Sequence, residues 1–112
     1  GQAVGVQINR LIDRGVRVIV ATVPDQGLTP FALAEKAANT DTDRAALLSA
    51  LSAEFNAGIR TTFVNDGRFV GLILGDEMVQ AMVKSPSSFS LSNVTQPVCA
   101  TALPACTTDT LV

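Results

Sequence analysis

The hydrophobic pattern switches between helical and strand-like periods along the chain. Apolar residues first recur at the spacing of one helix face, up to Gly15, where a helix would end. Residues 16–23 then form a short, nearly uninterrupted apolar run, typical of a strand in a parallel sheet covered on both faces. The residues of the helical pattern are Val4, Ile8, Leu11 and Ile12.

Two further helices are predicted in the middle of the chain. Thr29 and Pro30 suit the cap and the first position of one of them. The other covers residues 43–62, with Asp41 or Thr42 available as its cap. It carries an apolar stripe of the kind that packs against a core. The stripe consists of Leu47, Leu48, Leu51, Phe55 and Ile59.

A second strand and a last helix follow. The turn residues 65–67 precede an apolar run over residues 69–74, which predicts a strand. Asp76 is suited to cap the next helix, and Pro86 would end it. On that helix, Met78 and Met82 are predicted to be core contacts.

Strands that alternate with helices predict an α/β fold with a parallel sheet. Two strands, near 16–23 and 69–74, are too few for such a sheet, which usually has four to six. The missing strands are expected outside this chain or in a second copy of it. Residues 1–112 are therefore interpreted as a single partial domain, in which residues 85–112 form a loop-rich tail.

Composition and charge remove several classes of function. The chain has 112 residues, a net charge of −2, and no Trp or Tyr. Its basic residues are scattered singly, so nucleic-acid binding has no physical basis. Its apolar runs are far shorter than the roughly 20 residues of a membrane-spanning helix, so none is expected.

Cys99 and Cys106 lie in a tail rich in Ser, Thr and Pro. A disulfide between these two cysteines is predicted. It would indicate an oxidising compartment, and hence a secreted, periplasmic or cell-surface location. The alternatives are two unpaired thiols or a metal site. Two thiolates without histidine would leave a tetrahedral ion half coordinated.

The chain contains no histidine, so it lacks the usual general base of a serine triad. No residue cluster has metal-ligand spacing and no glycine pattern forms a phosphate loop, so neither a metal nor a cofactor is predicted. Asp25 follows the first strand, where loops of parallel α/β folds carry their sites, although it could simply bond to its own turn. Leu28 and Phe31 are either packing residues or the lining of an acyl pocket.

Three segments together resemble a known family. They are residues 16–30 (VRVIVATVPDQGLTP), residues 47–59 with Leu51, Phe55 and Asn56, and residues 85–99 (SPSSFSLSNVTQPVC). In this order they are similar to a strand and loop, the next helix, and a later Asn-Val-Thr loop of SGNH, or GDSL-type, esterases and lipases. The resemblance is greatest to secreted and autotransporter forms and covers most of the chain.

The resemblance implies a three-layer α/β/α, flavodoxin-like fold and a serine enzyme that acts on a small ester or lipid. The family's Gly-Asp-Ser block and Asp-x-x-His block are both missing here, so no catalytic residue is assigned and the chain alone is expected to be inactive. It implies instead a scaffold with a loop bordering the cleft, formed by Pro24, Asp25, Leu28 and Phe31. The alternative is a small, non-catalytic α/β binding or interaction module that completes its sheet as a dimer.

Overall fold

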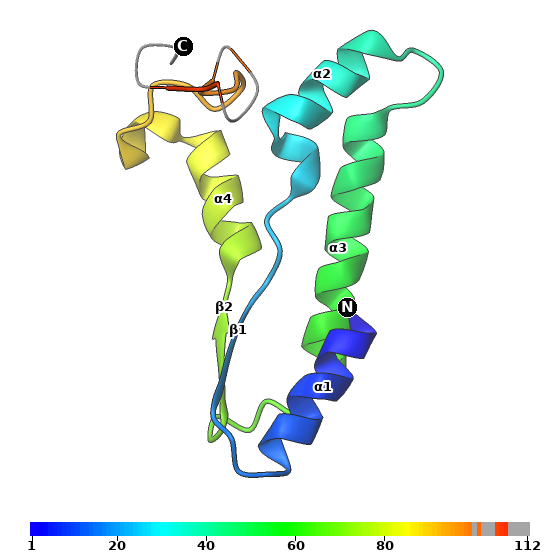
Figure 1. Cartoon of the computed structure of the whole chain (residues 1–112), viewed down its shortest axis with the longest axis vertical. Coiled ribbons are helices and arrows are strands. Elements are labelled where there is room, and N and C mark those ends of the chain that lie inside the picture. Colours follow the sequence, from blue (N-terminus) through cyan, green and yellow to red (C-terminus); the bar gives the residue numbers. More distant parts are fainter. Residues whose placement is uncertain (100, 102–104, 108–112) are drawn as a thin grey trace.

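A computed structural model describes residues 1–99, 101 and 105–107 of the chain (Figure 1). Four α-helices, two strands and two short 3₁₀ helices follow one another in these residues. They are α1 (Gln2–Ile12), β1 (Val18–Ala21), η1 (Gln26–Leu28), α2 (Pro30–Ala38), α3 (Arg44–Thr62), β2 (Val70–Ile73), α4 (Gly75–Lys84) and η2 (Pro86–Phe89).

The two strands pair in parallel, which confirms the α/β class. Val18 lies opposite Val70 and Ala21 opposite Ile73. Backbone bonds to Phe69 and Ile73 close the ladder at its two ends, at 2.8 and 3.0 Å. The strands are shorter than predicted, because the hydrogen-bonded ladder extends only over the residues where the two strands lie side by side.

One face of the sheet carries the core. Ile8 of α1, with Ile59 and Phe63 at the end of α3, packs against Val18 and its neighbours on that face. The other face exposes Ile19, which is 77% accessible. Both α1 and α3 lie on the same side, so the described residues cover one face of the strand pair and leave the other open.

Close backbone approach fixes α1 against α3. A Cβ atom added to Gly5 would lie 2.5 Å from the Cβ of Thr62, so only glycine fits there. Beside it, the Asn9 side chain donates to the Thr62 carbonyl at 3.0 Å and accepts from the Val64 N–H at 2.9 Å. These two bonds satisfy backbone groups where α3 ends.

The structure confirms the predicted cap of α2 and corrects the predicted cap of α3. Thr29 caps α2 by accepting a hydrogen bond from the Ala32 N–H, as expected. The cap of α3 is Asp43, which accepts from the Ala46 N–H at 3.0 Å, so the assignment to Asp41 or Thr42 was wrong by one or two positions.

The predicted apolar face of α3 is only partly buried. Ile59 lies in the core, as predicted, whereas Leu47 and Leu51, which are 52% and 58% accessible, do not. The buried face of α3 consists mostly of small and polar residues, because it meets loop backbone that needs hydrogen-bond partners. Those residues are Ala45, Ser52, Asn56, Gly58 and Ile59.

The described part of the tail contains a disulfide. Cys99 and Cys106 are bonded, with their Cα atoms 5.7 Å apart, which confirms the predicted pair. A disulfide is compatible with an extracellular location. Within the described part of the chain, every helix is too short or too polar to cross a membrane.

Candidate functional site

The carboxyl ends of both strands meet at one buried polar contact. Thr22 follows β1, and Asp76 lies in the first turn of α4, directly after β2. The Thr22 hydroxyl donates to the Asp76 carboxylate at 2.6 Å and accepts from the Asp76 N–H at 3.1 Å. Both residues are buried. This contact ties the exit of one strand to the helix that leaves the other.

Asn56 of α3 holds the loop that leaves β1. Its side-chain oxygen accepts from the Val23 N–H, and its side-chain nitrogen donates to the Val23 carbonyl, both at 2.8 Å. The same nitrogen lies 3.3 Å from the Asp76 carboxylate. Asn56 therefore satisfies both backbone groups of Val23, as a neighbouring strand would. It also joins α3 to the Thr22–Asp76 contact.

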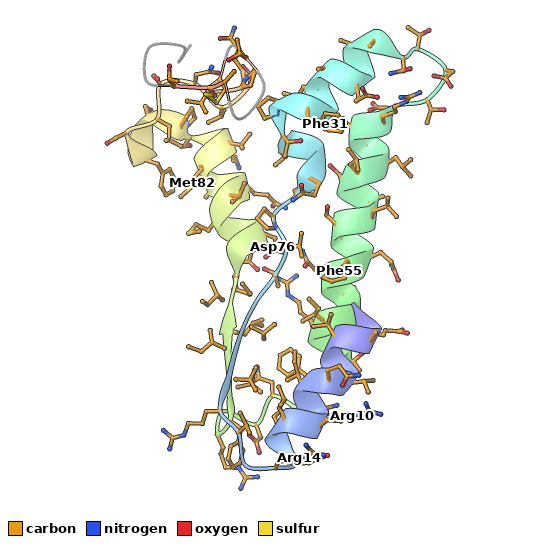
Figure 2. The ribbon with its side chains drawn as sticks, viewed as in Figure 1. Arg10, Arg14, Phe31, Phe55, Asp76 and Met82 are labelled. Carbon is orange, nitrogen blue, oxygen red and sulfur yellow. A yellow bond between two sulfur atoms is a disulfide. The ribbon has the colours of Figure 1, made fainter. Side chains whose placement is uncertain are left out.

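Arg60 supplies the counter-charge, one helical turn beyond Asn56. Its guanidinium lies 3.0 Å from the carboxylate of Asp76, which Figure 2 labels at the start of α4. Burial alone would raise the pKa of Asp76. The Thr22 hydroxyl, the Glu77 N–H and the Arg60 charge outweigh burial and hold that pKa below its ordinary value of 3.8.

The loop after β1 is held by side chains of α3. The Asp25 carboxylate accepts from the Gly27 N–H of its own turn at 2.9 Å and from the Ser49 hydroxyl at 2.7 Å. Ser52 accepts from the Gln26 N–H at 3.1 Å. Gly27 lies so close to α3 that a Cβ would overlap the Ala45 carbonyl and the Ser49 hydroxyl. The start of this loop is therefore fixed in place.

Two cavities lie on either side of the loop. A polar one of about 350 Å³ lies between α3 and α4, with Asp25, Arg60 and Asp76 in its wall. An apolar one of about 260 Å³ lies between the loop and the helix α4 with the segment that follows it. Asp25 borders both. The wall of the apolar cavity contains Pro24, Asp25, Leu28, Thr29, Pro30, Val79, Met82, Val83, Leu91 and Val94.

Three of the four predicted cleft residues lie together. Pro24, Asp25 and Leu28 border the apolar cavity. Phe31 lies apart from them on α2, is 67% accessible, and lines a separate hollow with Leu47 and Leu48. The turn between Asp25 and Phe31 sends the two ends of the segment to different surfaces.

The residues Thr22, Asn56, Arg60 and Asp76 form a polar cluster whose side chains bond to one another. Among the described residues, every buried side-chain nitrogen and oxygen has a hydrogen-bond partner. Asp76 is committed to Thr22, Asn56 and Arg60, and the chain has no histidine to act as base. The described side chains also contain no group of three metal-ligating residues close enough to hold an ion.

The role of this cluster is not apparent from the sequence. The predicted cap at Asp76 is wrong, because α4 has no side-chain cap and its N-cap position is Leu74. The available signal was positional, since Thr22 and Asp76 each end an apolar strand pattern. Asn56 gave no such positional signal, because it lies within the predicted helix over residues 43–62.

Comparisons of the chain with protein family models, with curated proteins and with solved structures give no match.

Proposed function

We propose that this chain is a segment of a serine ester hydrolase of the SGNH type, an esterase or lipase that acts on a small ester or lipid outside the cytoplasm. Its two strands would belong to a larger parallel sheet, the middle layer of a three-layer α/β/α fold. The observation that carries the proposal is the apolar cavity beside the carboxyl ends of the strands, bordered by Pro24, Asp25 and Leu28. In open α/β sheets, ligands bind at that edge.

In this proposal the chain contributes scaffold and one wall of the cleft. The nucleophilic serine, the oxyanion-binding donors and the histidine that moves the proton come from other segments of the enzyme. The Thr22–Asp76 contact and the Asn56 clamp keep the loop from Pro24 to Leu28 at a fixed height above the strands. A preorganised wall of this kind positions a substrate without reacting with it.

Hydrolysis of a short-chain p-nitrophenyl ester tests the proposal. The 112-residue chain is compared with a form extended at both ends to include its flanking coding sequence. Activity in the extended form alone, abolished by replacing the serine of a Gly-Asp-Ser motif with alanine, is the expected result. The proposal would be overturned if the extended form contained neither a Gly-Asp-Ser nor an Asp-x-x-His motif and showed no activity.

One observation favours a second candidate, a non-catalytic α/β interaction module that pairs with a second copy of itself. The open face of the sheet exposes Ile19 and Ile73, at 77% and 50%. Parallel sheets are almost always covered on both faces. In the first proposal the cover comes from the remainder of the enzyme, and in the second it comes from the partner copy.

A further inference from the structure

We propose that the apolar cavity between the β1–α2 loop and α4 binds the acyl chain of a neutral ester, with a chain of up to about eight carbons. The inference rests on the proposed function for the reaction that would follow. Binding itself needs only the 112-residue chain, because all residues of the cavity wall lie within it.

The chemistry of the wall selects hydrocarbon. Leu28 and Pro30 form one side, and Met82, on α4 in Figure 2, belongs to the other. Moving apolar groups from water onto such a surface is favourable, and the stabilisation increases with the apolar area that is buried. Methionine is flexible and polarizable, so Met82 can adapt to chains of different shape. The remaining apolar residues of the wall are Pro24, Val79, Val83, Leu91 and Val94.

The volume of the cavity indicates how much of an acyl chain it can hold. A cavity of about 150 Å³ is known to hold one benzene molecule. In the same proportion, a cavity of about 260 Å³ holds roughly ten non-hydrogen atoms. This is about the number in an ester group with an acyl chain of about eight carbons. A protein helix, about 10 Å wide, does not fit such a space.

The single charged group in the wall selects against free fatty acids. Asp25 is half-buried at the border of the cavity, and its Oδ1 atom is already bonded to Ser49 and Gly27. A second carboxylate placed beside it would be repelled and partly desolvated. A neutral methyl ester avoids both effects, so it is expected to bind more tightly than the acid of the same length.

The two methionines of the chain provide a direct test. Met82 lines the cavity, whereas Met78, on the same helix, is 50% accessible and lies outside its wall. The chain is labelled with ¹³C at the methionine methyl groups and titrated with methyl butanoate, hexanoate and octanoate. We expect the Met82 signal to shift at saturation while the Met78 signal stays in place. The affinity should rise about fourfold for each added methylene.

A matched pair of substitutions on α4 locates the site. Val83→Phe fills the cavity with a ring, and Ala81→Phe places the same ring on an exposed position of the helix outside the wall. The first should abolish the Met82 shift and the second should preserve it. Equal shifts of Met78 and Met82, or affinity that does not grow with chain length in the unmodified protein, would overturn the inference even if Val83→Phe fails to fold.

The two proposals fail in different ways. Binding of methyl hexanoate at Met82, with no hydrolysis by the extended form, would retain the acyl site and reject the hydrolase. Hydrolysis by the extended form without any shift at Met82 would retain the enzyme and reject this cavity as its acyl site.

Discussion

Asp76 carries a negative charge that is almost entirely removed from water, and the Arg60 guanidinium matches it at 3.0 Å. Replacing Asp76 by asparagine keeps the shape of the side chain but removes its charge. We expect Asp76→Asn to lower the free energy of unfolding at pH 7 by about 1–3 kcal/mol, since hydrogen bonds to a charged group are lost. Urea denaturation followed by circular dichroism measures this change. The expectation fails if the variant is as stable as the unmodified chain.

The same variant should change the pH dependence of stability. The pKa of Asp76 is lower in the folded chain than its ordinary value of 3.8. Ionised Asp76 therefore stabilises the fold above that value, and the stabilisation is lost as the pH falls through the lower folded pKa. The difference between the two proteins should shrink from pH 7 to pH 3. Asp66→Asn, at an exposed pair with Arg68, is the control and should change little.

At the scale of elements, the sequence predicted all four α-helices and both strands, because each has a strong period or a clear cap. The buried face that it predicted for α3 is right for Ile59 but wrong for Leu47 and Leu51. Leu47, Leu51 and Phe55 form the more hydrophobic stripe, yet Ser52 and Asn56 lie inside. A polar loop must pack on this helix, and its backbone groups need partners there. Periodicity locates an apolar face but not the neighbour that another face requires.

Substitutions on the two faces of α3 test this assignment. Leu51→Gln should change the free energy of unfolding by no more than about 0.5 kcal/mol, because the side chain is exposed in the folded chain. Ile59→Ala should lower it by about 2–5 kcal/mol, because Ile59 lies in the core with Ile8 and Phe63. Urea denaturation of both variants under one condition decides the matter. A larger cost for Leu51→Gln than for Ile59→Ala would contradict the observed orientation of the helix.

The whole molecule is long and open rather than closed around its sheet. Its extents are 47 × 36 × 30 Å, and α3 and α4 diverge from the level of the strands (Figure 1). The sequence predicted that two strands could not complete a sheet, and both outer edges of the observed pair have no strand beside them in the described residues. The polar cluster joins Thr22, Asn56 and Asp76 from three separate segments. The sequence gives a positional signal for Thr22 and Asp76 but does not show that Asn56 meets them.

The open sheet face should make the isolated chain associate with itself. Ile19 and Ile73 present exposed apolar side chains on a sheet whose edges are unpaired in the described residues, which is a common cause of association. Light scattering at several concentrations should give an average mass above the 11.6 kDa of one chain. The double substitution Ile19→Thr and Ile73→Thr keeps β-branched residues in the strands and should return the mass to one chain. Leu51→Thr, on the exposed stripe of α3, is the matched control and should leave association unchanged.

The form of that association separates the two proposed functions. A discrete dimer with a fixed mass over a wide range of concentration favours the interaction module, since an interface shared by two copies closes on itself. Mass that continues to rise with concentration favours a segment whose sheet is completed by other parts of an enzyme, because an unpaired edge has no natural end point. If Leu51→Thr abolishes association and the double threonine variant does not, the contact surface is the α3 stripe, and the sheet face is not the site of assembly.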